Sequence, residues 1–101
     1  MLNSEKIVLP KIFEKDVDRA IKILRGAGCS EIYLFGSIVA GKTRADSDLD
    51  LAIRGCPRGE FFHLLGSLLL ELDHSVDLID LDKPDPFARY LEREDALVRI
   101  G

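Results

Sequence analysis

The loop that joins two apolar runs in the first half of the chain constrains the fold more than any other stretch. The apolar run at residues 32–35 stops at Gly36-Ser37, and after a loop of ten residues a second run opens at residues 48–53 with two aspartates. Glycine and serine interrupt regular structure and favour turns. The simplest interpretation is two strands joined by a loop that carries functional groups.

The two aspartates at the start of the second run are expected to form a cation site. Side chains alternate between the two faces of a strand, so Asp48 and Asp50 share one face and the leucines beside them point to the other. At about 6–7 Å apart, the carboxylates repel by about 2–3 kcal/mol at an effective dielectric of about 20. Oxygen ligands of this kind favour Mg²⁺ that is bound together with substrate phosphates.

Gly36 and Ser37 have properties that suit a phosphate. Glycine lets the backbone come close to a ligand, and the serine hydroxyl and nearby amides can donate hydrogen bonds to phosphate oxygens. Residues 38–40 are expected to form a single helical turn whose N-terminal amides face the same place. An ordinary turn is the alternative interpretation of this pair.

These residues together resemble a known family. Gly36-Ser37, ten intervening residues, the Asp-x-Asp of Asp48 and Asp50, and a later strand at residues 76–79 that carries Asp77 are similar to the motif of the DNA polymerase β-type nucleotidyltransferases. The resemblance runs from about residue 11 to the C-terminus, and its spacing is fairly specific. In its short length the chain resembles the minimal nucleotidyltransferases, many of which are the antitoxin partners of HEPN-domain toxins.

The resemblance implies a role for each motif residue. Asp48 and Asp50 would hold Mg²⁺ on ATP, and Asp77 would help hold a second Mg²⁺ that activates the attacking hydroxyl. Gly36 and Ser37 would position the β- and γ-phosphates. The implied reaction moves AMP from ATP to a hydroxyl, which for an antitoxin is a tyrosine of its HEPN ribonuclease toxin, bound in a hetero-oligomer.

Positive charge is scarce in this chain. It has 14 lysines and arginines against 18 aspartates and glutamates, a formal net charge of −4. Stable binding to nucleic acid is therefore not expected. Lys42, Arg44, Arg54 and Arg58 are the one local cluster of positive residues, and they suit a nucleotide triphosphate. Lys42 and Arg44 are expected to neutralise its phosphates. The alternative, that each is only a solvated charge on a loop, is equally consistent with the sequence.

Length and composition predict a single domain over residues 1–101. A chain of 101 residues with 47% hydrophobic content can bury one core but has no room for a separate substrate domain. An enzyme of this size must therefore borrow part of its substrate site from a partner. The sequence shows neither a signal peptide nor an apolar stretch of membrane-spanning length, so we expect a cytoplasmic protein that does not bind membranes.

The cysteines and histidines are expected to have structural roles. Cys29 and Cys56 are too few and too far apart in sequence to suggest a disulfide framework or a zinc site, so both are expected to be reduced. His63 and His74 are expected to pack or to lie on the surface rather than to act in catalysis.

Hydrophobic periodicity predicts an α/β (α+β) domain. The expected elements are a helix at 11–25, a strand at 29–35, a strand at 48–54, a helix at 60–72 that is apolar nearly all round, a strand at 75–81, a helix with Asp85 as N-cap, and a short strand at 96–100. Residues 1–9 are either an extended arm or the lead-in to the first helix.

The site residues fix the expected topology. Gly36 leaves the first strand and Asp48 enters the second, so the two strands must be antiparallel neighbours for these residues to meet. Asp77 enters the third strand, which must then run parallel to the second, with helix 60–72 as the crossover. The result is the nucleotidyltransferase fold: a small mixed sheet in the order 1-2-3 with helices packed on one side. The third strand is apolar on both faces and is expected to be central or well covered.

Three functions remain open from the sequence. The first is an enzyme that transfers AMP to a hydroxyl of a partner protein. The second is a binding module that keeps the fold and neutralises its partner sterically, without catalysis. The third is nucleotidyl transfer to RNA or to a small molecule, against which stand the acidic charge and the absence of a second domain to hold such a substrate.

Overall fold

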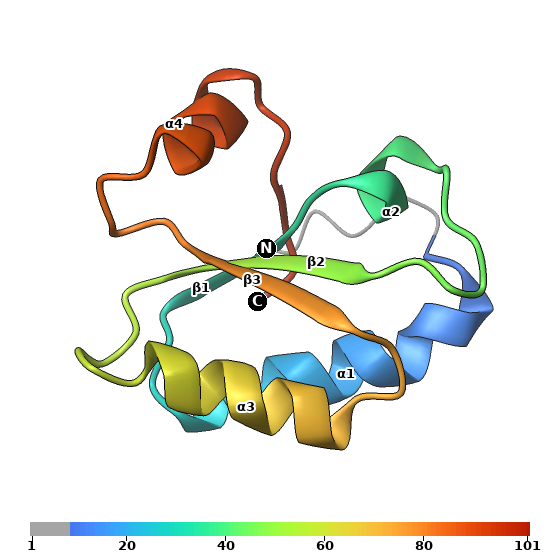
Figure 1. The fold of residues 1–101 in the computed structure, drawn as a ribbon, viewed down its shortest axis with the longest axis horizontal. Helices are drawn as coiled ribbons and strands as arrows, with labels where there is room; N and C mark the ends of the chain where they lie inside the picture. Colours follow the sequence, from blue (N-terminus) through green and yellow to red (C-terminus); the bar gives the residue numbers. More distant parts are fainter. Residues whose placement is uncertain (1–8) are drawn as a thin grey trace.

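The computed structural model describes residues 9–101, so the expected arm or lead-in at residues 1–8 lies outside the described part of the chain. The elements, in chain order, are α1 (Lys11–Gly26), β1 (Glu31–Leu34), α2 (Ser37–Ala40), β2 (Leu49–Arg54), α3 (Phe61–Glu71), β3 (Val76–Asp80), α4 (Pro86–Arg93) and β4 (Val98–Arg99). Each predicted element is present, with bounds that differ by a few residues at most. Figure 1 shows α1 and α3 on one face of the sheet and α4 on the other.

The sheet has the predicted strand directions. Its order is β3-β2-β1-β4, with β1 antiparallel to β2 and β2 parallel to β3. The predicted order of the first three strands is therefore present, and β4 extends it by pairing antiparallel with β1. The parallel pair needs a crossover, which α3 provides between β2 and β3.

The main core lies between the sheet and the pair of helices α1 and α3. Alternate residues of β2, Leu49, Leu51 and Ile53, point into it and are almost fully buried. Leu64 and Leu68 of α3 meet them from the helix side. This alternation is the one predicted from the sequence, and it leaves Asp50, Ala52 and Arg54 on the opposite face.

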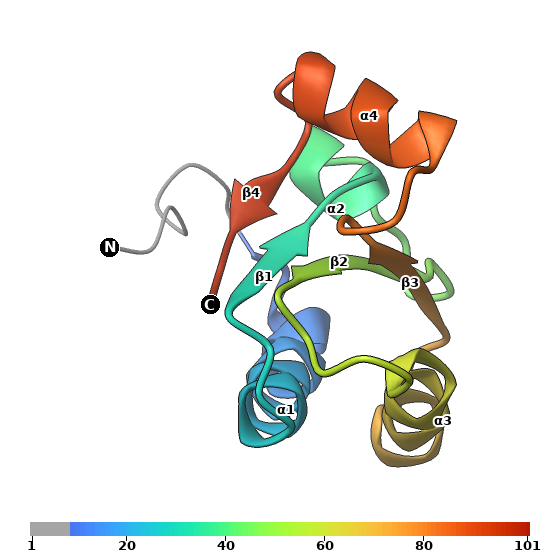
Figure 2. The same cartoon turned by 90° about the vertical axis from the view of Figure 1, so that its left-hand side faces the viewer.

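The prediction that all helices pack on one side is wrong, because α4 packs on that opposite face. Ala88 and Leu91 of α4 form a second, smaller core with Phe35, Ala52 and Leu81. Residues 51–53 of β2 are all buried, so both faces of this strand need a cover. The small side chain of Ala52 lets the helix approach the sheet. Figure 2 shows this two-sided arrangement from the side.

The third strand is neither central nor well covered. β3 forms one edge of the sheet, with β2 as its only strand neighbour among the described residues. Leu78 is buried, but Asp77 is exposed. A buried carboxylate would need a compensating partner, but water can solvate Asp77.

A buried carboxylate joins α1 to the turn between α3 and β3. Asp16 is 1% exposed and accepts hydrogen bonds from the backbone amides of Asp73 and His74, at 2.9 and 2.8 Å. The His74 Nδ1 atom lies 2.7 Å from the same carboxylate, and the imidazole packs on Phe13 with ring centroids 4.3 Å apart. His74 therefore has the packing role that the sequence predicted.

The prediction that the cysteines are reduced is wrong, because Cys29 and Cys56 form a disulfide. The register of the sheet explains the bond. Glu31 of β1 lies opposite Arg54 of β2. Because the strands are antiparallel, Cys29, two residues before Glu31, lies opposite Cys56, two residues after Arg54. Distance along the sequence was therefore the wrong measure for this pair.

No helix within residues 9–101 combines the length and the apolar character that crossing a membrane requires.

Candidate active site

The predicted site residues meet at one rim of the sheet. β1 ends there, the short helix α2 follows at once, and β2 and β3 both begin there (Figure 1). Gly36 is the N-cap residue of α2 and has a φ of 75°, a conformation that favours glycine. The chain can therefore turn sharply from β1 into α2 at the point where β2 enters the sheet.

Gly36 and Asp50 lie in direct contact. A Cβ atom built on Gly36 would lie 2.0 Å from Oδ2 of Asp50, which is far inside van der Waals contact. The backbone N–H of Ser37 donates a hydrogen bond to the same carboxylate. The sequence analysis assumed that the Gly-Ser turn meets the Asp-x-Asp pair, and the structure shows that only a residue without a side chain fits at position 36.

Asp77 is the register partner of Asp50. The parallel pairing of β2 with β3 places the two residues side by side, at the edge of the sheet. Asp48 precedes the first residue of β2 and is exposed, as is Asp77, whereas Asp50 is partly buried. All three predicted carboxylates therefore gather at one rim, with Asp50 as the most enclosed.

The three carboxylates interact electrostatically. Burial, followed by the negative charges of Asp77 and Asp48, raises the pKa of Asp50 to about 6. The hydrogen bond from Ser37 acts in the opposite direction but is too weak to restore the ordinary value. Within residues 9–101 no positive group acts on the pKa of Asp50, so this carboxylate near two others favours a cation.

A cavity of about 590 Å³ opens beside these carboxylates. Asp50 and Asp77 line it on the side of the sheet, and Phe35, Phe87 and Tyr90 line it with aromatic rings. Phe87 and Tyr90 were not among the predicted site residues. The signal that could have placed them is the uncovered face of β2, because α4 has to lie on the face that carries Asp50.

Comparison with known families identifies the fold and its motif. The family model described as "Polymerase beta, Nucleotidyltransferase" matches residues 18–98, which include every predicted site residue. This chain belongs to the polymerase β-type nucleotidyltransferase family. No curated protein sequence matches it.

Solved structures with the same fold are toxin–antitoxin complexes. A toxin–antitoxin crystal structure with AMP-PNP is 28% identical, with a TM-score of 0.66 over 81% of this nucleotidyltransferase and 69% of that chain. A complex of tri-AMPylated Shewanella oneidensis HEPN toxin with MNT antitoxin is 30% identical, with a TM-score of 0.54. The match covers 71% of this chain and 58% of that chain. A MntA–HepT toxin–antitoxin complex, at 24% identity and a TM-score of 0.61 over 85% and 69%, shares the fold.

The nucleotidyltransferase site suits a hard cation that binds together with a nucleotide. Within residues 9–101, no three histidine, cysteine or carboxylate side chains are arranged as a complete metal site. Mg²⁺ does not need one, because it is commonly held by one or two carboxylates together with substrate phosphates and water. The oxygen donors of Asp48, Asp50 and Asp77 and the raised pKa of Asp50 suit that mode of binding.

Lys42 and Arg44 lie in the exposed loop between α2 and β2 of the nucleotidyltransferase. The Lys42 amide donates to the Ser37 carbonyl at 2.9 Å, and the Arg44 amide donates to the Ser47 hydroxyl at 2.7 Å. These backbone bonds order the loop beside the rim. In the described part of the chain neither side chain takes part in an ion pair, so both are available to bind an anion.

The predicted cluster of four positive residues is not present as one group. Arg54 lies at the opposite end of β2 from Asp48, and it pairs with Glu31 of β1 and Glu92 of α4. Arg58 lies in the loop after β2 and lines a separate cavity of about 440 Å³ at that end of the sheet. Only Lys42 and Arg44 remain as candidates for binding phosphates at the rim.

Proposed function

We propose that this chain is a Mg²⁺-dependent nucleotidyltransferase that moves AMP from ATP to a tyrosine hydroxyl of a HEPN-domain toxin, and so acts as its antitoxin. The observation that carries the proposal is the contact between Gly36 and Asp50, with Asp77 in register beside them. This contact brings a phosphate-binding turn and metal-binding carboxylates to one point, which is what phosphoryl transfer requires.

The chain's residues would divide the work of this reaction. Asp48 and Asp50 would hold Mg²⁺ on the triphosphate, and Asp50 and Asp77 would hold a second ion near the acceptor. The backbone of Gly36 and Ser37 would bind the terminal phosphates, at the place where the Ser37 amide now binds Asp50. Lys42 and Arg44 would neutralise the leaving pyrophosphate. Bound Mg²⁺ would supply charge neutralisation and a lower pKa for the attacking hydroxyl.

The reaction balances without any further reactant. The acceptor oxygen forms a bond to the α-phosphorus of ATP while the bond from that phosphorus to its bridging oxygen breaks. Pyrophosphate leaves, and Asp77 takes the proton of the hydroxyl. Because the exposed Asp77 lies at an open edge of the sheet, a hydroxyl carried on a large partner can reach it.

The similar structures support the choice of partner and nucleotide. One contains AMP-PNP, an ATP analogue, in a toxin–antitoxin complex, and another contains a HEPN toxin that carries AMP.

The test is a labelling experiment. The chain is incubated with Mg²⁺ and ATP labelled at the α-phosphate, alone and with the HEPN-domain protein encoded beside it. We expect label on the partner with the wild type and with Asp80→Asn, and none with Asp50→Asn. Asp80 is a matched control, since it lies at the far end of β3 and accepts a hydrogen bond from the Asp82 amide that asparagine can also accept.

The steric alternative predicts a different result in cells. A variant with both Asp48→Asn and Asp50→Asn should bind the toxin but fail to protect cells from it. Full protection by this variant would mean that the chain neutralises its partner by binding alone. Label on RNA or on a small molecule, with none on the partner, would support the third function instead.

A further inference from the structure

We infer that the aromatic face of α4 binds the base of the nucleotide by stacking, and that this chain reads the identity of the base only weakly. The inference rests on the proposed function, because it places the base of the same nucleotide whose phosphates would lie at Gly36 and Ser37. It concerns Phe87 and Tyr90, to which neither the motif nor the proposed reaction gives a role.

The rings of Phe35, Phe87 and Tyr90 form an aromatic wall that is continuous with the phosphate-binding turn at Gly36 and Ser37. Phe35 immediately precedes Gly36, and its ring meets the ring of Phe87 edge-on, with centroids 5.9 Å apart. The Phe87 and Tyr90 rings follow in a stacked arrangement, with an interplanar angle of 15° and centroids 6.3 Å apart. A nucleotide whose phosphates lie on the turn therefore meets this wall within its own length.

The cavity has apolar walls on two sides. Val39 and Ala40 of α2 line it as well as Phe87 and Tyr90 of α4. The short helix α2 follows the end of β1 at the rim of the sheet, and Figures 1 and 2 show α4 on the face opposite α1 and α3. With the carboxylates of Asp50 and Asp77 in its lining, this cavity offers a polar end to metal-bound phosphates and an apolar space to a flat nucleobase. Phe87 and Tyr90 are 43% and 50% exposed, so their rings are accessible to a ligand.

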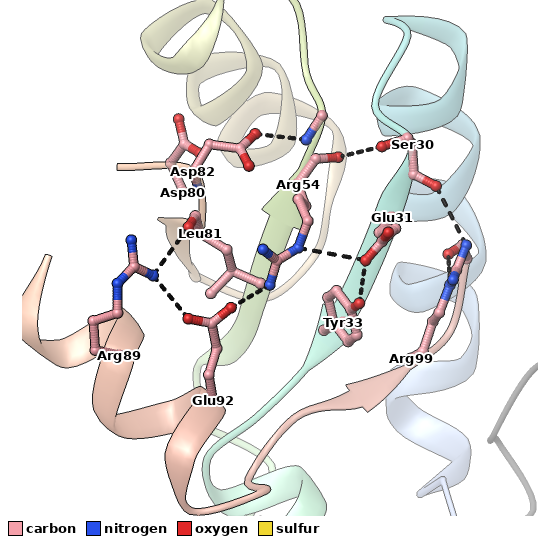
Figure 3. Close-up of polar contacts among 12 residues, drawn as sticks. Ser30, Glu31, Tyr33, Arg54, Asp80, Leu81, Asp82, Arg89, Glu92 and Arg99 are labelled. Atoms are coloured by element: carbon pink, nitrogen blue, oxygen red, sulfur yellow. Dashed lines mark hydrogen bonds and ion pairs between the residues drawn. The ribbon is translucent and has the colours of Figure 1, made fainter. Parts of the chain in front are cut away.

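The wall is held in place before any ligand binds. Glu92 of α4 pairs with Arg54 of β2 and, at 2.8 Å, with Arg89 on its own helix. Figure 3 shows these contacts joining α4 to β1 and β2, with Arg89 also reaching the Leu81 carbonyl. Ala88 and Leu91 anchor the helix in the second core. A wall that is fixed in this way loses little conformational entropy when a base stacks on it.

The lining of the cavity explains the expected weak base selectivity. Among the described residues that line it, the only polar side chains are those of Asp50, Asp77 and Tyr90. The two aspartates are assigned to metal binding, which leaves one hydroxyl for the edge of a base. Strong discrimination between purines needs donors or acceptors that the wrong base leaves unpaired. Stacking alone accepts any base, because each has a π-face.

The experiment compares ATP with a ligand that has no base. Binding of ATP, GTP and inorganic tripolyphosphate to the full chain is measured calorimetrically in Mg²⁺. We expect the wild type to bind ATP and GTP with affinities within about tenfold of each other, and both more tightly than tripolyphosphate. Phe87→Ala and Tyr90→Ala should each weaken ATP binding by about 5- to 30-fold and leave tripolyphosphate binding unchanged.

Two control variants separate stacking from other effects. Tyr90→Phe keeps the ring and should recover most of the ATP affinity that Tyr90→Ala loses. Phe62→Ala removes an aromatic side chain that is 81% exposed on α3, across the sheet from the cavity, and should change nothing. Circular dichroism melts of every variant show whether the fold is kept.

Three outcomes would overturn the inference. Unchanged ATP affinity in Phe87→Ala and Tyr90→Ala would mean that the base does not lie on α4, while the proposed transfer could still stand. If these variants kept ATP affinity but raised the KM for the protein acceptor, the wall would bind the acceptor instead. If the wild type bound neither ATP nor tripolyphosphate in Mg²⁺, the proposed function would be overturned as well.

Discussion

Gly36 and Asp50 show how one missing side chain can decide whether a site exists. The sequence analysis took the meeting of the Gly-Ser turn with the Asp-x-Asp pair as its premise, and inferred from it that the two strands are antiparallel. It could not predict how closely they meet. The pairing of Asp50 with Asp77 followed from the expected parallel register, whereas the exposure of Asp77 did not, because the apolar run around it suggested a covered strand.

Substitution of Gly36 by alanine tests the contact. The added Cβ would lie 2.0 Å from the Asp50 carboxylate, and the φ of 75° is also unfavourable for alanine. We expect Gly36→Ala to abolish nucleotidyl transfer and to destabilise the fold by about 1–3 kcal/mol in urea unfolding. Gly41→Ala is the matched control, because Gly41 has a φ of 73° but no atom within 4 Å of its Cβ position. Equal activity losses in both variants would assign the effect to backbone strain rather than to the contact.

The raised pKa of Asp50 predicts a dependence of stability on pH. The folded protein holds this proton up to about pH 6, whereas the unfolded chain releases it near the ordinary value of 3.8. Ionised Asp50 therefore opposes folding, and metal-free protein should lose stability as pH rises from about 4 to about 6. Allowing for its partial exposure, we expect Asp50→Asn to be more stable than the wild type at about pH 7.5 by about 1–2 kcal/mol.

Urea unfolding in EDTA at about pH 4 and about pH 7.5 measures this effect. The advantage of Asp50→Asn over the wild type should shrink at the lower pH, where the wild-type carboxyl is protonated. Asp80→Asn, on the same sheet but at the other end of β3, should track the wild type at both values. An advantage of Asp50→Asn that is the same at both values would contradict the pKa argument.

At the scale of elements, periodicity predicted what each segment forms, and the meeting of site residues predicted how the strands run. The side on which α4 packs was missed, although the run Leu51-Ala52-Ile53 already indicated a strand buried on both faces. The disulfide was missed for a related reason. Cys29 and Cys56 become neighbours only once the β1–β2 register is known. Because disulfides are rare in the reducing cytoplasm, this bond argues against the cytoplasmic location that the sequence analysis expected.

The junction between α1 and the α3–β3 turn depends on one carboxylate that the sequence did not single out. Burial acts to raise the pKa of Asp16, but hydrogen bonds from the Asp73 and His74 amides and the His74 ring outweigh it and lower the pKa overall. Asp16→Ala leaves both amides unpaired, so we expect a loss of about 2–4 kcal/mol in the free energy of unfolding. Asp18→Ala, on the exposed side of the same helix, should change it by less than about 0.5 kcal/mol.

The contribution of Asp16 should also depend on pH. Because its folded pKa is lowered, the stabilisation is present above the ordinary value of 3.8 and is lost as pH falls through the folded value. The wild type and Asp16→Ala should therefore converge in stability in strong acid. A constant difference down to about pH 2 would mean that the packing of the side chain, and not its charge, carries the effect.

At the scale of the whole molecule, the residues that the rim places for ligand binding lower the stability of the ligand-free fold. Residues 9–101 bring three carboxylates together with no ion-pair partner among them, which costs stability, and a cation with a nucleotide relieves that cost. Mg²⁺ with ATP at a hundredfold excess over its dissociation constant should stabilise the fold by about 2.7 kcal/mol. For a domain of 101 residues this raises the thermal midpoint by roughly 10 °C. Asp50→Asn should lose most of this gain and Asp80→Asn should keep it, as measured by thermal denaturation with and without both ligands. Equal gains in the two variants would mean that the nucleotide binds elsewhere, because mass action stabilises the fold only through a site that the folded chain provides.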